Sequence, residues 1–484
     1  MCGIVGVVNE SREAGPDIFF ACTEMQHRGK ESGGIAVFDE EAGYMDKHIG
    51  MGDMAQVFMG KSAASLRGKI GIGHVRYSNT GSSSLKNAQP VIGFFRGKEF
   101  ACGHNGNLVN TKALMNECSM VNRFFDSDCS DTRVVAGMIS QSRAASFKEA
   151  LLEVLPKLEG AFCFLFLCDG NLYAARDPYG FHPFQLGRRG RDCILASESM
   201  VFDHLSIESP SRVERSAEFE RDISPGELFI AGRSGEYSMM WSEPKNLKFD
   251  IFEYIYFLRP DSKVYGVRVE LARRMMGRYL AEEQPAEADI IVPVRSSGSA
   301  ASRGYAERMR EMGYLCKEEP EGLFRPNVVG RVWVEPFQEI REEYLRLKFN
   351  IIPELIDGRD VIVVDDSIVR GNTIKRIVKL MRQGGARKVH VRISCPPYMW
   401  PDIYGNDTYK DYQNDRLVAL TLMGDAAAIA KSIGVDSLGY LSLEKTKRAI
   451  LDVKEPGSIL DMDSFYDGVF TKKYPAGTGD YIIR

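Results

Sequence analysis

Apolar residues in the second half of the chain alternate between short unbroken runs and one-sided helical spacing. ADIIVPV at residues 288–294 and VIVV at residues 361–364 predict strands buried on both faces, as in a parallel sheet. Apolar residues recur every three or four positions at 269–280 and 374–381, which predicts helices with one buried face. Because strands and helices alternate, this half predicts an α/β domain with a mostly parallel sheet.

The first half has a different pattern, in which apolar strands are joined by tight turns. GIVGVV at residues 3–8 predicts one strand, and the apolar runs on either side of an Asp-Gly turn, within residues 159–187, predict paired strands. A polar, irregular stretch follows. We therefore expect a first domain at residues 2–231, a linker at 232–250, a second domain at 251–445 and a C-terminal tail at 446–484.

Length and composition agree with two ordinary globular domains. The chain has 484 residues, more than one core normally supports, and is 44% hydrophobic and 26% charged. Its net charge of −4 gives no basic surface for nucleic acid or for an anionic membrane. The first residues lack the basic flank and long apolar core of a secretory signal, and no run is long enough to span a bilayer, so we expect a cytoplasmic protein.

Cysteine and histidine spacing argues against metal sites built from these residues. The ten cysteines contain no CxxC pair, and the seven histidines contain no HExxH motif. Only Cys316 and Cys395 lie beyond residue 250, too few for the four thiolates of an iron–sulfur cluster in that half. We expect neither a disulfide framework nor an iron–sulfur cluster.

Two acids stand where the predicted strand at 361–364 ends. Asp365 and Asp366 are followed by a loop of small and hydroxyl residues and then by the predicted helix at 374–381. Backbone amides at a helix N-terminus suit a phosphate, while the two acids suit sugar hydroxyls or Mg²⁺. The alternative is a solvated turn with two surface acids.

This segment resembles the phosphoribosyl pyrophosphate (PRPP) loop of type I phosphoribosyltransferases. The resemblance implies that Asp365 and Asp366 hold the ribose hydroxyls and take part in binding Mg²⁺. It also implies that the following loop wraps the 5′-phosphate, through Ser367, Ile368, Val369, Arg370, Gly371, Asn372 and Thr373.

Cys2 is the candidate nucleophile of the first half. Removal of Met1 would leave a cysteine whose own α-amine, with an ordinary pKa of about 7.7–8.0, can act as base for the thiol. The alternative is an inert, packed thiol. Further along, Arg76 is a suitable clamp for an α-carboxylate, Asn105 and Gly106 offer two oxyanion donors, and Asp131 suits an α-ammonium. Taken singly, Arg76 could equally be a surface ion-pair partner, Asn105 and Gly106 an ordinary turn, and Asp131 a helix cap.

The order of these pieces resembles the glutaminase domain of N-terminal-nucleophile amidotransferases. Its signature motifs MCGIVG, QHRG, GHVRY and HNGN all occur, starting at Met1, Gln26, Gly73 and His104. The resemblance implies an αββα sandwich, in which Cys2 attacks the side-chain amide of glutamine and Asn105 and Gly106 form the oxyanion hole. It also implies that Arg76 and Asp131 hold the backbone end of glutamine.

The second half resembles the glutamine PRPP amidotransferases, with two departures. FEYIYFLRPDS at residues 252–262 matches the family closely. The turn that receives pyrophosphate and magnesium, usually Pro-Asp-Ser-Gly, here reads Arg295, Ser296, Ser297 and Gly298, so only Ser297 and Gly298 remain as PRPP ligands, with Ser297 also near the metal. The loop that closes over PRPP is changed at residues 325–333, although Arg331 survives, and Lys348 follows the basic pattern beside the site.

Together the motifs imply an amidotransferase that makes 5-phosphoribosylamine, glutamate and pyrophosphate from PRPP, glutamine and water. The resemblance further implies a Mg²⁺ cofactor, inhibitory purine nucleotides and a homo-oligomer. Two alternatives remain. One is a glutaminase paralogue with another acceptor, although neither an SGGxDS-type ATP loop nor paired sugar-isomerase domains appear after residue 250. The other is a PRPP-binding regulatory protein, which the altered loops at Arg295 and Asn327 suggest.

Overall fold

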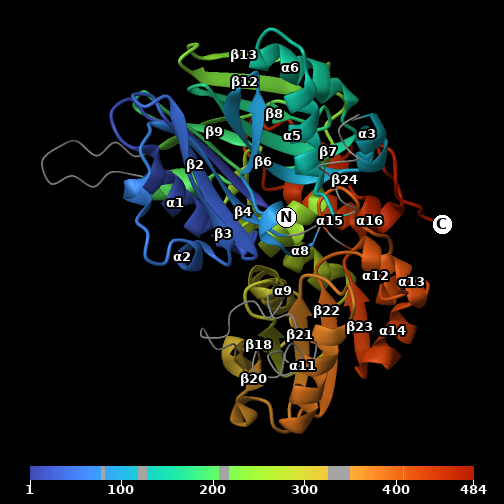
Figure 1. Cartoon of the computed structure of the whole chain (residues 1–484). Coiled ribbons are helices and arrows are strands. Elements are labelled where there is room, and N and C mark those ends of the chain that lie inside the picture. Colours follow the sequence, from blue (N-terminus) through green and yellow to red (C-terminus); the bar gives the residue numbers. More distant parts are fainter. Residues whose placement is uncertain (78–81, 118–127, 206–216, 325–348, 407) are drawn as a thin grey trace, which may run out of the picture.

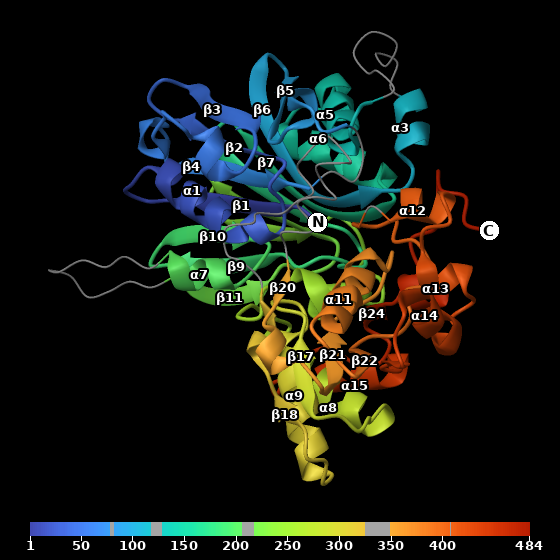
Figure 2. The same cartoon turned by 90° about the horizontal axis from the view of Figure 1, so that it is seen from below.

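The chain folds into two halves that pack against each other (Figure 1). The computed structural model describes residues 1–77, 82–117, 128–205, 217–324, 349–406 and 408–484. The N-terminus lies between the two halves in both views (Figures 1 and 2). Within these described residues, no helix is both long and apolar enough to cross a membrane.

The first half contains two antiparallel sheets. The first sheet has seven strands, in the order β11 (Glu218–Asp222), β9 (Gln185–Arg189), β10 (Asp192–Ala196), β1 (Gly3–Val8), β4 (Ile70–Arg76), β2 (Ser32–Asp39) and β3 (Tyr44–Met51). The second has six, in the order β13 (Tyr237–Met240), β12 (Glu227–Gly232), β8 (Asn171–Arg176), β7 (Gly160–Cys168), β6 (Lys98–Leu108) and β5 (Val91–Phe95). The predicted hairpin around the Asp-Gly turn is β7–β8.

Apolar side chains from both sheets form one shared core, and helices cover the outer faces. Ile4, Ile72, Leu165 and Leu172 belong to the core between the sheets. The helix α1 (Ala14–Glu24) packs on the first sheet, and α5 (Asp131–Gln141) and α6 (Phe147–Val154) pack on the second. This arrangement confirms the αββα sandwich that the motifs implied.

The second half is built on a five-stranded parallel sheet, as predicted. Its order is β18 (Lys317–Glu318), β17 (Ile290–Pro293), β21 (Asp360–Asp365), β22 (Lys388–Ile393) and β23 (Ser437–Tyr440). The main helices are α8 (Val269–Glu283), α9 (Ser299–Glu311), α11 (Asn372–Gln383), α14 (Ala426–Ile433) and α15 (Leu443–Leu451). From β17 the chain passes through α9 to one edge, and from β21 through α11 toward the other. Right-handed crossovers therefore place α9 and α11 on opposite faces of the sheet.

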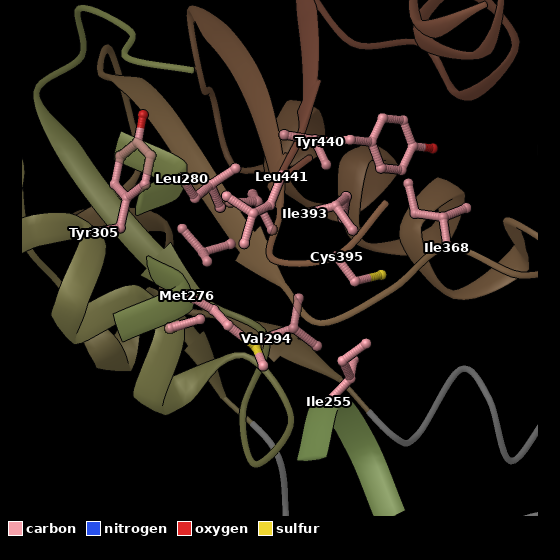
Figure 3. Close-up of a cluster of buried hydrophobic side chains, with 14 of the residues drawn as sticks. Ile255, Met276, Leu280, Val294, Tyr305, Ile368, Ile393, Cys395, Tyr440 and Leu441 are labelled. Atoms are coloured by element: carbon pink, nitrogen blue, oxygen red, sulfur yellow. The ribbon is translucent and has the colours of Figure 1, made fainter. Parts of the chain in front are cut away.

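The core of the second half continues to the carboxyl ends of the strands (Figure 3). Val294, Ile393 and Cys395 follow or end strands of the sheet, and Ile368 lies in the loop after β21. Because the side chain of Ile368 is buried in this core, it anchors the loop after β21.

Two short strands tie the ends of the second half together. The stretch expected to be a linker, residues 232–250, contains β13, which pairs with β12 of the first half, and β14 (Phe249–Asp250). The chain's last part returns to this point, because β24 (Phe465–Tyr466) pairs in parallel with β14. Beyond it, the Tyr481 hydroxyl accepts a hydrogen bond from Asn107 Nδ2 of β6 at 2.9 Å. The tail therefore contacts both halves.

The helices α8 and α9 cross at unusually close range, which gives a test of the fold. A Cβ placed on Gly277 of α8 would lie 1.9 Å from the Ala301 carbonyl oxygen of α9. We expect Gly277→Ala to push the helices apart and to lower the free energy of unfolding by about 1–3 kcal/mol, as overpacking does.

Thermal unfolding of the full chain measures this effect. Gly103→Ala is the matched control, since the nearest atoms to its added methyl would lie at 3.8 and 3.9 Å, an ordinary contact. Equal melting temperatures for Gly277→Ala and the unsubstituted chain would contradict the tight crossing.

Candidate functional site

Cys2 is buried immediately before β1, at the junction of the two halves. Its backbone N–H donates to Asn105 Oδ1 at 3.0 Å, and its Sγ lies 3.4 Å from the Tyr77 carbonyl oxygen, to which it donates. Burial raises the pKa of the Cys2 thiol, although the N-terminal amine and the Tyr77 hydrogen bond oppose the rise. A thiol in this state needs a base next to it, and removal of Met1 turns the Cys2 nitrogen into an amine.

Asn105 and Gly106 lie next to this thiol on β6. The Asn105 side chain is fully buried, and its Nδ2 has no hydrogen-bond partner among the described residues. Gly106 has a φ of +141°, and a Cβ there would lie 2.1 Å from the Ala161 carbonyl oxygen, so only glycine fits. A buried donor without a partner costs stability in the empty site, and an oxyanion would satisfy it.

The two residues predicted to bind the backbone end of glutamine already carry partners. Arg76, the last residue of β4, donates to Glu31 Oε1 at 2.6 Å and to the Ser82 carbonyl at 3.2 Å. Asp131 begins α5 and accepts hydrogen bonds from backbone amides of Leu108 and Thr132. Burial alone would raise the pKa of Asp131, but the His104 imidazole and these amides hold it below its ordinary value. Both side chains are thus held in place, and Asp131 is kept ionised.

Sequence reasoning missed a buried ion cluster behind Cys2. Arg28, whose side chain is completely buried, donates from Nε to the Cys2 carbonyl oxygen at 2.8 Å. Its terminal nitrogens pair with Glu198 at 2.6 Å and with Glu253 at 2.7 Å, and both carboxylates are also completely buried. Arg28 belongs to the QHRG motif, so it could be singled out. Its partner Glu253 is 225 residues away in the other half and carried no signal.

The side chains of this cluster stay ionised although they are buried. Burial alone would lower the pKa of Arg28, but Glu253 and Glu198 raise it above its ordinary value. In the same way, His27 and Arg28 hold the pKa of Glu198 below its ordinary value despite burial. Glu253 begins a π-helical turn at Glu253–Phe257, a rare element that often marks functional positions.

The acid pair of the second half lies at the carboxyl end of β21. Asp365 and Asp366 are only 6% and 5% exposed, which excludes the alternative of two solvated surface acids. Ser297 Oγ donates to Asp365 Oδ1 at 2.9 Å, and Ser367 Oγ donates to Asp366 Oδ2 at 2.6 Å. Burial, and then the negative charge of Asp366, raise the pKa of Asp365 well above its ordinary value. Such a pair favours a bound cation or hydroxyl donors.

The two loops that meet here follow neighbouring strands. Pro293 of β17 is opposite Val364 of β21, and a Cβ on Gly298 would lie 2.3 Å from the Val364 carbonyl oxygen. Gly298 therefore lets the turn after β17 touch β21. Since the connections from β17 and β21 run to opposite edges, this is the point where open α/β sheets bind ligands. Gly371, with a φ of +77°, then turns the chain into α11, whose first turn has no side-chain cap among the described residues.

Arg295 and Ser296, which depart from the family's usual turn, lie beside the Asp365–Asp366 pair. Arg295 forms an ion pair with Glu321 and a 3.4 Å hydrogen bond to the Pro320 carbonyl, and Ser296 has a φ of +76°. Arg370 pairs with Asp411 at 2.6 Å. Arg331 and Lys348, together with the altered loop at residues 325–333, lie outside the described residues.

Comparison with known proteins places the chain in one family. A sequence model described as a glutamine amidotransferase domain matches residues 74–204. The amidophosphoribosyltransferase of Mycobacterium tuberculosis is 37% identical over 99% of this chain and 87% of its own length, and that of Staphylococcus aureus is 36% identical over 99% and 92%. A solved structure of glutamine PRPP amidotransferase from B. subtilis, complexed with ADP and GMP, matches with a TM-score of 0.85 and 33% identity and covers 99% of both chains. These matches confirm the resemblance seen in the motifs, and the chain belongs to the amidophosphoribosyltransferase family.

Proposed function

We propose that the chain transfers the amide nitrogen of glutamine to PRPP, making 5-phosphoribosylamine, glutamate and pyrophosphate in the opening step of purine synthesis. The observation that carries this function is the presence of two separate buried sites in one chain. One is Cys2 beside the unpartnered Asn105 amide, and the other is the Asp365–Asp366 pair where β17 and β21 end. Membership of the amidophosphoribosyltransferase family supports it.

In the first site, the α-amine of Cys2 takes the thiol proton and the sulfur attacks the glutamine amide. Negative charge then develops on the former carbonyl oxygen, and Asn105 Nδ2 and the Gly106 N–H are the donors suited to hold it. Arg76 and Asp131 bind the α-carboxylate and α-ammonium of glutamine, which requires Arg76 to share its contact with Glu31. Ammonia leaves, and water then releases glutamate from the sulfur.

In the second site, ammonia attacks the anomeric carbon of PRPP as pyrophosphate departs. Asp365 and Asp366 bind the ribose hydroxyls and stabilise the positive charge that develops on the sugar. Amides from Ser367 to Thr373, backed by the N-terminal end of α11, hold the 5′-phosphate. Ser297 and Gly298, on the neighbouring turn, face the pyrophosphate. Arg331 and Lys348 complete this set of ligands by resemblance.

The donor set of the second site fits Mg²⁺. Asp365, Asp366 and Ser297 offer only oxygen atoms, the ligands that Mg²⁺ prefers. Burial and the charge of Asp366 raise the pKa of Asp365, and a bound cation would oppose this rise. These three residues would hold the ion, which would neutralise pyrophosphate charge. Arg295, held by Glu321 at the same turn, adds a permanent positive charge from the protein.

Several finer features follow from the family membership. We assign residues 2–231 to glutamine hydrolysis and 251–445 to phosphoribosyl transfer. Because the B. subtilis relative was solved with ADP and GMP, purine nucleotides are proposed as inhibitors of this chain as well. A cytoplasmic homo-oligomer that needs no iron–sulfur cluster completes the proposal.

A second candidate is a regulatory protein that binds PRPP without transferring nitrogen. The observation in its favour is the Arg295–Glu321 ion pair in the turn that would receive pyrophosphate. Pyrophosphate release, assayed with magnesium, PRPP and either glutamine or ammonium, separates the two candidates. If PRPP binds but neither nitrogen source yields pyrophosphate, the regulatory function is correct.

Cys2→Ala tests the division of labour between the two sites. We expect glutamine-dependent pyrophosphate release to fall by about 10³-fold or more, because the nucleophile is gone, while ammonium-dependent release stays near its original rate. Steady-state assays of both reactions on the same preparation provide the measurement. Loss of both activities in a folded variant would contradict the assignment of Cys2 to glutamine alone.

Asp365→Asn tests the acid pair. Asparagine keeps an oxygen for the Ser297 and Asp366 hydrogen bonds but removes the charge, so we expect both glutamine- and ammonium-dependent activity to fall by about 10²-fold or more. Since folding raises the pKa of Asp365, its ionisation destabilises the fold increasingly above pH about 4, where the unfolded carboxyl ionises.

The variant should therefore melt at a higher temperature than the unsubstituted chain at pH 7.5, and this gain should shrink toward pH 4. Melting curves across that range provide the measurement. A variant that is less stable at pH 7.5 would show that the buried charge is already compensated within the protein.

A further inference from the structure

A second buried acid pair lies at the junction of the two halves, and neither of its members belongs to the two sites described above. Asp250 ends β14 and is 1% exposed, and Asp402, in the segment after β22, is 2% exposed. Asp250 Oδ1 accepts the Phe252 amide at 2.9 Å, and Asp402 Oδ1 accepts the Tyr404 amide at 2.8 Å. Burial and the mutual repulsion of the two groups raise the pKa of Asp250 well above its ordinary value.

Two polar atoms beside this pair have no partner. Asp250 Oδ2 and the Tyr466 hydroxyl are both inaccessible to solvent and form no hydrogen bond with any described residue. Asp250 and Tyr466 are neighbours across the parallel pair β14–β24, and Tyr466 is 2% exposed. A buried carboxylate oxygen and a buried hydroxyl left unsatisfied at one place cost stability, unless something binds there.

Aromatic rings surround the Tyr466 side of this pair. The Tyr466 ring lies 4.9 Å from Tyr404 and 5.5 Å from Phe181, measured between ring centroids. Carboxylates combined with aromatic faces are typical of sites for small monovalent cations of the ammonium type.

The pair is also close to the start of the chain. A Cβ on Gly405 would lie 2.5 Å from the Met1 sulfur and 2.6 Å from His182 Nε2, so Met1 packs against the segment that carries Asp402. The His182 imidazole and the amine of Met1, the residue that must be removed to free the Cys2 amine, both act electrostatically on Asp402. Because Met1 directly precedes the nucleophile, this contact brings the segment that carries Asp402 close to Cys2.

We propose that Asp250, Asp402 and Tyr466 form a binding site for ammonium at the domain junction, near the start of the chain where ammonia is released. The proposal rests on the proposed function for the origin of the ammonia. Glu253, Arg28 and His182 face the pair from the neighbouring elements and set its charge balance.

The proton balance of this site allows ammonia to leave it as a nucleophile. One carboxyl of the pair is protonated when the site is empty, since two adjacent buried carboxylates cannot both ionise cheaply. Arriving ammonia takes that proton and becomes ammonium between two carboxylates. On departure the ammonium returns the proton to the carboxylate, so neutral ammonia leaves and the site is restored.

The test compares melting temperatures of the full chain in ammonium chloride and in sodium chloride at equal ionic strength and pH, without substrates. A ligand that binds only the folded state raises the melting temperature. We expect an ammonium-specific rise for the unsubstituted chain, and its loss in Asp402→Asn and in Asp250→Asn. Asp177→Asn is the matched control and should keep the rise, because Asp177 is a fully buried acid whose oxygens accept backbone amides.

A second measurement counts the products of the glutamine-dependent reaction. The unsubstituted chain should form glutamate and pyrophosphate in equal amounts, whereas in Asp402→Asn the ratio of glutamate to pyrophosphate should at least double as ammonia escapes. Equal melting in the two salts, an equal rise in potassium chloride, or an unchanged rise in both variants would each overturn the ammonium site. Absence of any transferase activity would overturn the proposed function instead, and would leave the melting comparison intact.

Discussion

The position of the nucleophile depends on one buried guanidinium. Arg28 holds the Cys2 carbonyl with Nε and places its other nitrogens between Glu198 of the first half and Glu253 of the second. Removing one partner of such a buried pair typically costs about 3–5 kcal/mol, because the remaining charge is left without compensation. Separating the halves would therefore remove the Glu253 partner of the same guanidinium that holds the Cys2 carbonyl. Catalysis at the thiol and packing of the domains are constrained by the same residue.

This constraint explains why so much of the junction is polar. Glu198 also accepts the Ser262 hydroxyl and the Arg259 amide, both from the second half, at 2.6 and 2.9 Å. His182 reaches the Tyr404 carbonyl at 3.0 Å, and the tail returns to Asn107, two residues after Asn105. An apolar junction of the same area would tolerate sliding, whereas directional bonds to charged groups fix one arrangement. A fixed arrangement is what two sites need if a small neutral molecule is to pass between them without meeting water.

The parts of this structure that could be predicted from sequence are those encoded locally. The run at 361–364 followed by Asp365 and Asp366 predicts a strand with acids at its end, and the structure has that strand as β21. The motifs around Cys2, Asn105 and Asp131 likewise belong to continuous segments with their own turn and cap signals. Partnerships across the halves could not be predicted, because no local pattern says that Arg28 meets Glu253 or that Asp250 lies beside Tyr466. Those pairs exist only once the chain has folded, and the same is true of the Glu31 partner of Arg76.

The Arg28 cluster and the Asp250–Asp402 pair, both buried at the junction, differ in whether their polar atoms have partners. This difference indicates their roles. Every terminal nitrogen of Arg28 faces a carboxylate, so that cluster is complete without a ligand and serves as structure. Asp250 and Asp402 both have raised pKa values, as does Asp365, because burial opposes ionisation. Asp250 Oδ2 and the Tyr466 hydroxyl also have no hydrogen-bond partner among the described residues, so a ligand could satisfy them. Natural proteins keep such destabilising sites where function requires them. This contrast in partners is the physical reason to assign a ligand to the Asp250–Asp402 pair and none to the Arg28 cluster.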